Sequence, residues 1–317
     1  MESELYKTRS LSSCMKSAYD MFVSNIKTIF HRTWLPAVLL AVFSAVSMVL
    51  FYNIIIQSYV IVPMAGNSSL THIFILAGFA ILLLLLSIAA SVWFYAIVIS
   101  LLDGKSMKVN LPRVIRLALL TIALTFGISI IVWSINVIPY FGSNKKGISP
   151  DAFEVSAIIS IAIYICFAIA MIPTLYSSMK YLLEPEQKLF SVFGKPYLRG
   201  WRHWGYLFML CFLAGIIVSI IYLVVNMPAN IDALAVATDG AGMMLGDATG
   251  LPGYFMPVAA IASLLSSFIM IYVGSWFMII LYYAYGSIEA KEKAKQEQKQ
   301  AMQKIKTQIE PDFEEVK

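Results

Sequence analysis

The chain has 317 residues, of which 60% are hydrophobic and only 13% are charged. An ordinary soluble domain carries roughly a quarter charged residues, so this composition excludes a soluble globular protein. The formal net charge of +5 comes from basic residues beside apolar runs. Membrane orientation alone produces this pattern, so the charge does not indicate a nucleic-acid partner.

The first 34 residues are mostly polar and precede every apolar run. We therefore expect a cytoplasmic N-terminal segment (1–34) and no cleavable signal peptide. Residues 16–34 (KSAYDMFVSNIKTIFHRTW) place Tyr19, Ile26 and Phe30 at helical spacing among basic residues. The pattern predicts an amphipathic helix that lies in the membrane interface.

Six long apolar runs follow, and none has an Asp, Glu, Lys or Arg in its central part. Crossing a bilayer takes roughly 20 apolar residues in a helix, and the runs lack the alternation of barrel strands. The sequence predicts an all-α, polytopic membrane helix bundle that occupies residues 35–287. The predicted spans are about 35–62, 73–102, 117–139, 152–176, 206–226 and 254–285.

The connections between the spans differ in character. Residues 188–204 (KLFSVFGKPYLRGWRHW) are again basic and aromatic and directly precede a span, as residues 16–34 do; we call these two segments the first lead (16–34) and the second lead (188–204). Gly194 and Pro196 predict a broken helix in the second lead. The longest outward connection, 227–253, is rich in small and apolar residues. We expect a flexible or partly helical surface loop there, and a re-entrant segment is the alternative.

Residues 288–317 form a charged tail rich in helix formers. Glu289 and Lys293 have the i, i+4 spacing that supports a helix. The tail is expected to continue the sixth span as a solvated cytoplasmic helix that Pro311 ends.

Basic residues are divided very unequally between the two sides of the predicted membrane. All of the 23 Lys and Arg except Lys145 and Lys146 fall in segments on the side that holds both termini. Basic residues close to span ends resist translocation, so that side is expected to be cytoplasmic. The predicted location is the bacterial cytoplasmic (inner) membrane, with six spans and both termini inside.

Two sets of residues are candidates for function. Asn53, Gln57 and Asn136 are polar groups inside spans, and they could line a polar path or form helix–helix contacts. Basic residues of the two leads are candidate contacts for anionic lipid headgroups. They are Lys16, Lys27, Arg32, Arg199 and Arg202.

The sequence offers no catalytic, cofactor or metal site that we can assign. A membrane zinc protease needs HExxH, whereas His31, His72 and His203 stand isolated in the sequence. Asp239 and Asp247 of the outer connection lack EF-hand spacing. We therefore expect a protein that is not an enzyme.

The two leads (AYDMFVSNIKTIFHRTW and SVFGKPYLRGWRHW) give the chain a resemblance to a group of bacterial six-span membrane proteins. These proteins look like the membrane domain attached to some glycerophosphodiester phosphodiesterases. The resemblance implies a six-helix membrane fold, and it carries no activity over because the phosphodiesterase catalytic domain is absent from this sequence.

Two hypotheses for function remain open at this stage. The first is a non-enzymatic structural or accessory protein that contacts the lipid bilayer, anionic headgroups or other membrane proteins. The alternative is a transporter or flippase for a hydrophobic or zwitterionic substrate, in which Asn53, Gln57 and Asn136 line a path and Pro173 acts as a hinge.

Overall fold

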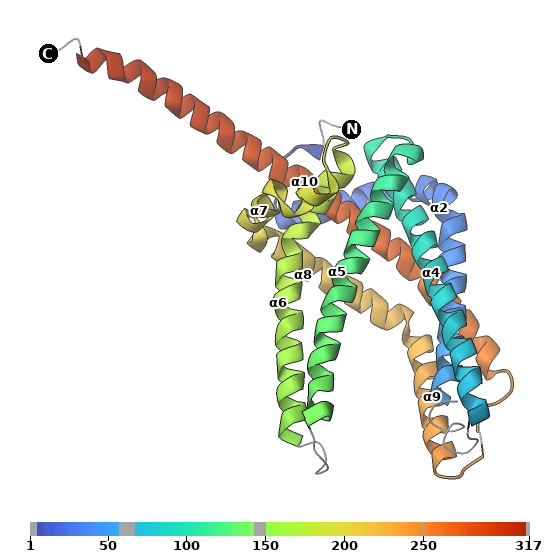
Figure 1. The fold of residues 1–317 in the computed structure, drawn as a ribbon. Coiled ribbons are helices and arrows are strands. Elements are labelled where there is room, and N and C mark those ends of the chain that lie inside the picture. The colour runs from blue at the N-terminus through green and yellow to red at the C-terminus, as the bar shows by residue number, and fades with distance from the viewer. Residues whose placement is uncertain (1–4, 57–66, 143–149, 249, 315–317) are drawn as a thin grey trace. The chain divides into compact units, whose positions relative to one another are not determined.

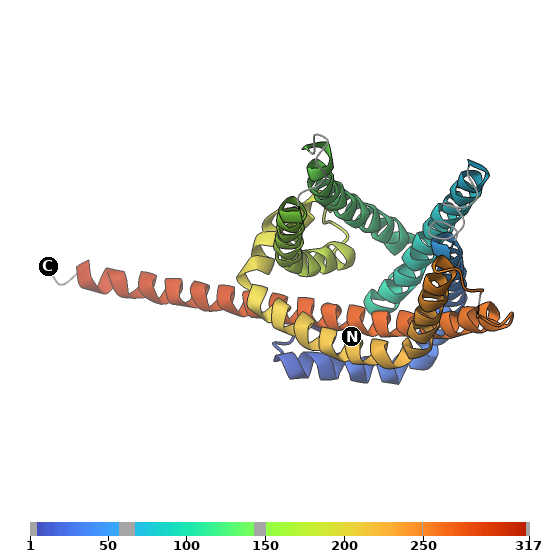
Figure 2. The ribbon, with the colours of Figure 1, turned by 90° about the horizontal axis from the view of Figure 1, so that it is seen from below.

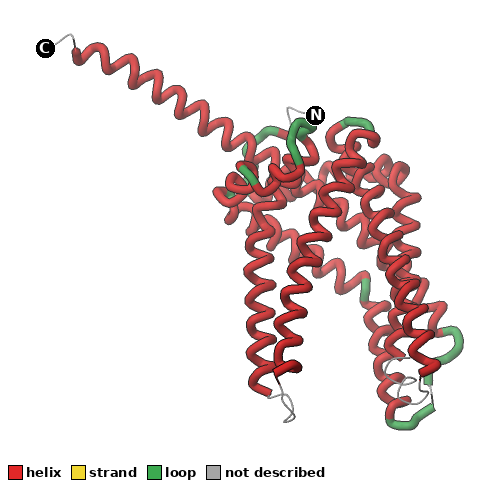
Figure 3. The backbone as a smooth tube through the Cα atoms, viewed as in Figure 1, coloured by secondary structure: helices red, strands yellow, loops and turns green. Residues whose placement is uncertain are grey.

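The structure is a computed structural model that describes residues 5–56, 67–142, 150–248 and 250–314. The described part is helical almost throughout and contains no strand (Figure 3), which confirms the all-α prediction. Its elements are α2 (Leu11–Ile56), α4 (Asn67–Asp103), α5 (Met107–Gly142), α6 (Pro150–Leu183), the 3-10 helix η2 (Leu189–Phe193), α7 (Lys195–Arg202), α8 (Trp204–Val225), α9 (Met227–Met244) and α10 (Phe255–Glu314).

Six helices in the described part of the chain are long and apolar enough to cross a membrane, as expected of a multi-pass membrane protein. They are α2, α4, α5, α6, α8 and α10, one for each predicted span. Along them, side chains such as Leu84, Leu85 and Ile158 point away from the rest of the protein. In a water-soluble protein such residues would be buried, whereas lipid is a favourable neighbour for them.

The chain forms two compact units. Unit 1 consists of Met1–Phe22, Leu120–Cys211 and Met278–Lys317, and unit 2 consists of Val23–Leu119 and Phe212–Phe277. Each unit has buried side chains of its own.

The core of unit 1 is built around α10 from Met278 onward. Ile279, Ile280 and Ile288 of α10 are fully buried, as are Leu207 and Leu210 of α8. Within this unit α6 and the second half of α5 lie side by side (Figures 1 and 2), and Asn136 of α5 bonds across to α6. Burial on α10 continues as far as Glu292, beyond the expected start of the tail at 288.

The core of unit 2 joins α2, α4 and α10 through aromatic rings. Tyr272 of α10 stacks on Phe30 of α2 and meets Phe94 of α4 edge to face, with ring centroids 5.8 and 5.9 Å apart. The Thr33 hydroxyl lies 3.3 Å from the Tyr272 hydroxyl. Small residues on α2, among them Ala37 and Ala41, are fully buried, so a neighbouring helix can approach closely.

A short polar turn joins α4 to α5 in unit 2. Gly104 has φ 71°, a left-handed conformation that ends α4 and that glycine adopts without strain. Buried Asn110 donates from Nδ2 to Asp103 Oδ1 at 3.0 Å and to Ser100 Oγ at 3.2 Å. The side-chain carboxylate of Asp103 therefore holds the first turn of α5 against the end of α4.

The first lead and the first span form one helix, α2, with Pro36 inside it. Three faces follow along its first half. Cys14, Ala18, Ile29 and Thr33 are buried, while Lys16, Asp20 and Lys27 are exposed on another face. An exposed apolar stripe lies between these two faces, and its members are Tyr19, Val23, Ile26, Phe30 and Trp34.

The second lead is interrupted, as Gly194 and Pro196 predict. The 3-10 helix η2 ends at Phe193, and α7 begins at Lys195 with Pro196 in its first turn. The connection 227–253, which the sequence predicts to face outward, contains α9 (Met227–Met244), so the expectation of a partly helical segment is confirmed.

The tail departs from prediction at its end. Residues 293–304 are exposed, as expected of a solvated helix. However, α10 runs without interruption from Phe255 to Glu314 (Figure 1), so the expectation that Pro311 ends it is wrong. A proline inside a helix removes one backbone N–H donor and crowds the carbonyl four residues earlier, and the helix can still continue past it.

Candidate functional site

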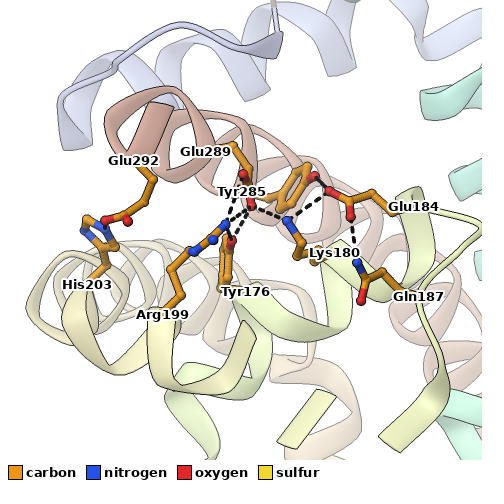
Figure 4. A network of polar contacts seen from close by, with 9 residues as sticks. All are labelled: Tyr176, Lys180, Glu184, Gln187, Arg199, His203, Tyr285, Glu289 and Glu292. Carbon is orange, nitrogen blue, oxygen red and sulfur yellow. Dashed lines mark hydrogen bonds and ion pairs between the residues drawn. The ribbon is translucent and has the colours of Figure 1, made fainter. Parts of the chain in front are cut away.

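A connected set of charged and phenolic side chains lies in unit 1, where α6, α7 and α10 meet (Figure 4). Its centre is the Glu289 carboxylate on α10. Lys180 Nζ donates to Glu289 Oε1 at 2.7 Å, and Arg199 Nη1 donates to Oε1 at 3.1 Å and to Oε2 at 3.3 Å. The Tyr176 hydroxyl also donates to Glu289 Oε1. Two cations and a phenol therefore converge on one carboxylate.

Glu184 is the second carboxylate of this network. It accepts from the Tyr285 hydroxyl at 2.7 Å and from Gln187 Nε2 at 3.0 Å, and Lys180 Nζ lies 3.0 Å from its Oε1. Burial raises the pKa of Glu184, but the Tyr285 bond and the Lys180 ammonium outweigh it, so the pKa lies below its usual range. Lys180 consequently bridges Glu184 to Glu289.

A third carboxylate, Glu292, pairs with His203 at the start of α8. His203 Nε2 lies 2.8 Å from Glu292 Oε1, and both side chains are nearly buried. His203 stands isolated in the sequence, and its partner comes from α10, 89 residues further along the chain.

Arg199 links the two parts of the network. Burial lowers the pKa of its guanidinium, but the Tyr176 hydroxyl and the charges of Glu289 and Glu292 raise it further, so the net shift is upward. Arg199 therefore carries its charge throughout the physiological pH range.

Helical spacing explains why these residues meet. Tyr176 and Lys180 are one turn apart on α6, and Glu184 follows directly after the helix ends at Leu183. Tyr285 and Glu289 are likewise one turn apart on α10. Residues four apart share a helix face, so each helix presents a short ladder of polar groups to the other.

Pro173 determines how α7 and α8 attach to α6. A proline lacks the N–H that would bond the carbonyl four residues earlier, here that of Ile169. Trp204 Nε1 donates to this carbonyl at 3.3 Å, and the Tyr197 hydroxyl donates to the neighbouring carbonyl of Ala170 at 2.9 Å. Aromatic residues of the second lead thus satisfy carbonyls on the α6 face that the proline perturbs.

Gly200 allows α7 to approach α6 at the same place. A Cβ on Gly200 would stand 2.7 Å from the Pro173 carbonyl oxygen and 3.0 Å from its Cα. Real Cβ atoms do not approach a backbone oxygen so closely. The absence of a side chain at 200 is therefore what lets Arg199 reach Glu289.

The N-terminal residues pack on the same stretch of α10. Arg9 donates from its backbone N–H to Ser287 Oγ at 2.9 Å, and its guanidinium lies 4.7 Å from the centre of the Tyr283 ring. Gly286 leaves room for the backbone of Leu5, whose oxygen would otherwise meet a Cβ at 2.4 Å. Cys14 is completely buried there, with its Sγ 3.7 Å from the Ile280 oxygen.

The polar residues predicted inside the spans have different outcomes. Asn136 donates to Ser160 Oγ on α6 at 2.8 Å and to the Val132 carbonyl at 2.8 Å, so it makes a helix–helix contact. Asn53 lies near the end of α2, but its side chain and all of Gln57 are outside the described residues.

The predicted headgroup residues fall into two groups. Lys16, Lys27, Arg32 and Arg202 are exposed and take part in no described ion pair. Arg199 is half-buried and bonded to Glu289. The headgroup contacts themselves stay a prediction for all five residues.

Sequence reasoning missed the network residues Lys180, Glu184, Tyr285 and Glu289. The spacing of Glu289 to Lys293 predicts only a solvated helix face. One local signal was available: Glu289 is the first acidic residue after a long apolar run, and Lys180 and Glu184 stand at i, i+4 spacing after another. Nothing local indicated that the two sites face each other.

Glu184, Glu289 and Glu292 all contact a donor already, so the arrangement is suited to joining helices rather than to taking a proton from a substrate. Among the described residues, no three His, Cys, Asp or Glu side chains come together as metal ligands. Comparisons with protein-family models, with curated proteins and with solved structures found no match. The resemblance to six-span bacterial proteins therefore stays a prediction.

Proposed function

We propose that this chain is a non-enzymatic, accessory protein of the bacterial cytoplasmic membrane, with both termini in the cytoplasm. Its role is to contact anionic lipid headgroups and partner proteins through the basic ends of its helices. Six apolar spans anchor it, and the polar network of unit 1 holds the basic segments in fixed positions.

The exposed stripe on α2 is the observation that carries this proposal. Tyr19, Phe30 and Trp34 are about half exposed, and Lys16 and Lys27 lie on the adjacent face. Aromatic and aliphatic groups beside lysines are typical of helices that bind the headgroup region of anionic membranes. A stripe facing bulk water would instead leave this apolar surface without a favourable neighbour.

The bonds of Asn136 bear on the alternative of a transporter. Its amide is used by Ser160 and by its own helix, and Ser156 Oγ lies 3.4 Å from its Oδ1. These bonds support a role in helix packing for this residue, and no described contact favours a substrate path past it.

The test is lipid co-purification of the full chain, measured by native mass spectrometry after mild detergent extraction. A variant with Gln at Lys16, Lys27, Arg32 and Arg202 removes four exposed charges and leaves the network intact. We expect its enrichment of anionic over zwitterionic lipid to fall by more than half. The matched control places Gln at four exposed tail lysines and should keep the enrichment: Lys293, Lys295, Lys299 and Lys304.

Protein partners are tested separately by truncation after Lys295, which removes the exposed tail and keeps Glu289 and Glu292. Proteins cross-linked to the full chain in membranes should be reduced in this variant. If the four-residue variant and the truncation both leave lipid and protein co-purification unchanged, the proposed function is wrong.

A further inference from the structure

A cavity of about 420 Å³ opens in unit 1 beside the polar network, between the end of α6 and the start of α7. Three of its lining residues are cations and none is a carboxylate. The lining residues are Lys180, Gln187, Ser191, Lys195, Pro196 and Arg199. Such a surface favours an anion as its occupant.

The cations of this cavity keep hydrogen-bond donors to offer. Lys180 directs its ammonium at Glu184 and Glu289, and an ammonium has three N–H groups. Every described bond of the Arg199 guanidinium starts from Nη1, while its fork carries five N–H groups. Lys195 is exposed and takes part in no described ion pair.

The carboxylates of the network make this arrangement stable without an occupant. Glu184 and Glu289 balance Lys180 and Arg199 and hold them in place, so repulsion between these cations is compensated. Lys195 remains as unbalanced positive charge at the first residue of α7. The N-terminal end of a helix adds partial positive charge from its unbonded N–H groups.

The shape of the donor set suits a phosphate group better than a carboxylate. Lys180 reaches the cavity from α6, and Lys195 and Arg199 reach it from successive turns of α7. A phosphate offers several acceptor oxygens pointing in different directions, so it can meet donors from both helices. A carboxylate offers only two oxygens in one plane. The cavity is also large enough to take more than a phosphate alone.

Exposed apolar residues beside the cavity indicate where the phosphate comes from. Phe190 and Phe193 of η2 and Leu198 and Trp201 of α7 point outward. Aromatic residues at the edge of a membrane sit at headgroup level, with their apolar parts toward the acyl chains. These side chains would therefore bring the cavity to the depth of lipid phosphates.

We propose that the cavity lined by Lys180, Lys195 and Arg199 binds one phosphate group, supplied by the headgroup of an anionic phospholipid. The proposal rests on the proposed function and sharpens it, because it replaces a general attraction to headgroups by one saturable site. Lys180 and Arg199 form its inner wall, and Lys195 closes it from the exposed side.

The test titrates the purified full chain in detergent with phosphatidylglycerol and counts bound lipids by native mass spectrometry. Wild type should bind one lipid saturably ahead of weaker additions. Lys195→Gln should weaken this first binding about fivefold to tenfold, as expected for one charge-assisted contact. Lys188→Gln is the matched control, because Lys188 is exposed directly before η2 and does not line the cavity. This variant should change the affinity for the lipid less than about twofold.

Two further probes identify the occupant. Phosphatidylcholine should bind the first site about fivefold more weakly than phosphatidylglycerol, because its choline carries a positive charge near the cations. Inorganic phosphate, followed by calorimetry, distinguishes the source. If inorganic phosphate binds in a way that depends on Lys195 and displaces the lipid, the site recognises phosphate and a soluble source can fill it. If inorganic phosphate does not displace the lipid, the site belongs to the lipid headgroup.

The inference is wrong if Lys195→Gln binds phosphatidylglycerol as wild type does, or if phosphatidylcholine binds the first site equally well. Thermal unfolding of Lys195→Gln should match wild type, so that a loss of binding is not a loss of fold. The variant with Gln at Lys16, Lys27, Arg32 and Arg202 separates the two proposals. If it keeps both the saturable lipid and the overall enrichment, and truncation after Lys295 also leaves protein co-purification unchanged, the proposed function fails and the cavity stands.

Discussion

The two basic and aromatic leads of this chain look alike in sequence and are used differently in the structure. The first is part of one continuous helix, α2, and its Lys16 and Lys27 are exposed. The second is interrupted at Gly194, and its Arg199 is bonded to Glu289 on α10. Positive charge beside an apolar span can therefore stay exposed or hold helices together.

The difference has a structural cause. On α2 the charged face is separate from the buried face, so its cations contribute nothing to packing. On α7 the buried position Gly200 is adjacent to Arg199, and its close approach to Pro173 brings the guanidinium within reach of Glu289. A glycine thus decides whether the neighbouring cation is paired.

Unfolding of unit 1 can be followed at Cys14, which is completely buried there. A thiol-reactive dye reports exposure of this residue on heating, in a background in which Cys166 and Cys211 are replaced by alanine. The midpoint of this thermal labelling measures the stability of unit 1.

Glu289→Gln should have the largest effect. The substitution leaves Lys180 and Arg199 mostly buried without their shared carboxylate, which we expect to cost about 2 to 4 kcal/mol and to lower the midpoint by several degrees. Glu297→Gln, on an exposed turn of the same helix, is the control and should leave the midpoint unchanged. Equal midpoints for the two variants would mean that the network does not stabilise unit 1.

Gly200→Ala should destabilise unit 1 by about 1 to 3 kcal/mol, because the new methyl group overlaps the Pro173 carbonyl. Gly205→Ala is the matched control, since nothing lies within 4 Å of its added Cβ. Alanine there should be neutral or slightly stabilising, because it favours the helix more than glycine does. A midpoint for Gly200→Ala at or above wild type would contradict the close approach of α7 and α6.

Trp204→Phe should cost about 1 kcal/mol, since it removes the donor to the Ile169 carbonyl. The reason can be tested with Pro173→Ala, which restores an N–H to that carbonyl. In the Pro173→Ala background, the cost of Trp204→Phe should shrink. An unchanged cost would show that the indole stabilises through packing on Phe208, its stacked neighbour, and not through the hydrogen bond.

Acidification tests the Glu184 bonds. The pKa of Glu184 is lower in the folded chain than in the unfolded chain, where it is about 4.3. Its contribution to stability is therefore complete above that value and is lost as the pH falls through the folded pKa. Here unfolding is followed by circular dichroism, because thiols react too slowly with the dye in acid. Between about pH 6 and about pH 3, the unfolding midpoint of wild type should fall by more degrees than that of Glu184→Gln. Exposed Glu186→Gln is the control and should follow wild type.

Neutralising the first lead should have the smallest effect on folding. Lys16→Gln and Lys27→Gln, singly or together, should change the free energy of unfolding by less than about 0.5 kcal/mol, because both side chains are exposed. Arg199→Gln should cost clearly more. If the Lys16 variant destabilises unit 1 as strongly as Arg199→Gln, the contrast between the two leads is wrong.

The sequence by itself determined the all-α class, the six spans and the interruption of the second lead. These features depend on local physics: a bilayer requires long uncharged helices, and Gly194 followed by Pro196 disfavours a continuous helix. The helical part of the outer connection was also within reach of local reasoning, whereas the end of α10 was not, since a single proline did not break it.

Only the tertiary structure decided which charged residues pair. Arg199 meets Glu289 across 90 residues, and Lys180 meets the same carboxylate across 109. Periodicity identifies the face of a helix on which a residue lies, but not the helix that covers this face. The free energy of a buried charge depends on that neighbour, so the sequence alone could not separate Arg199 from Lys16 and Lys27.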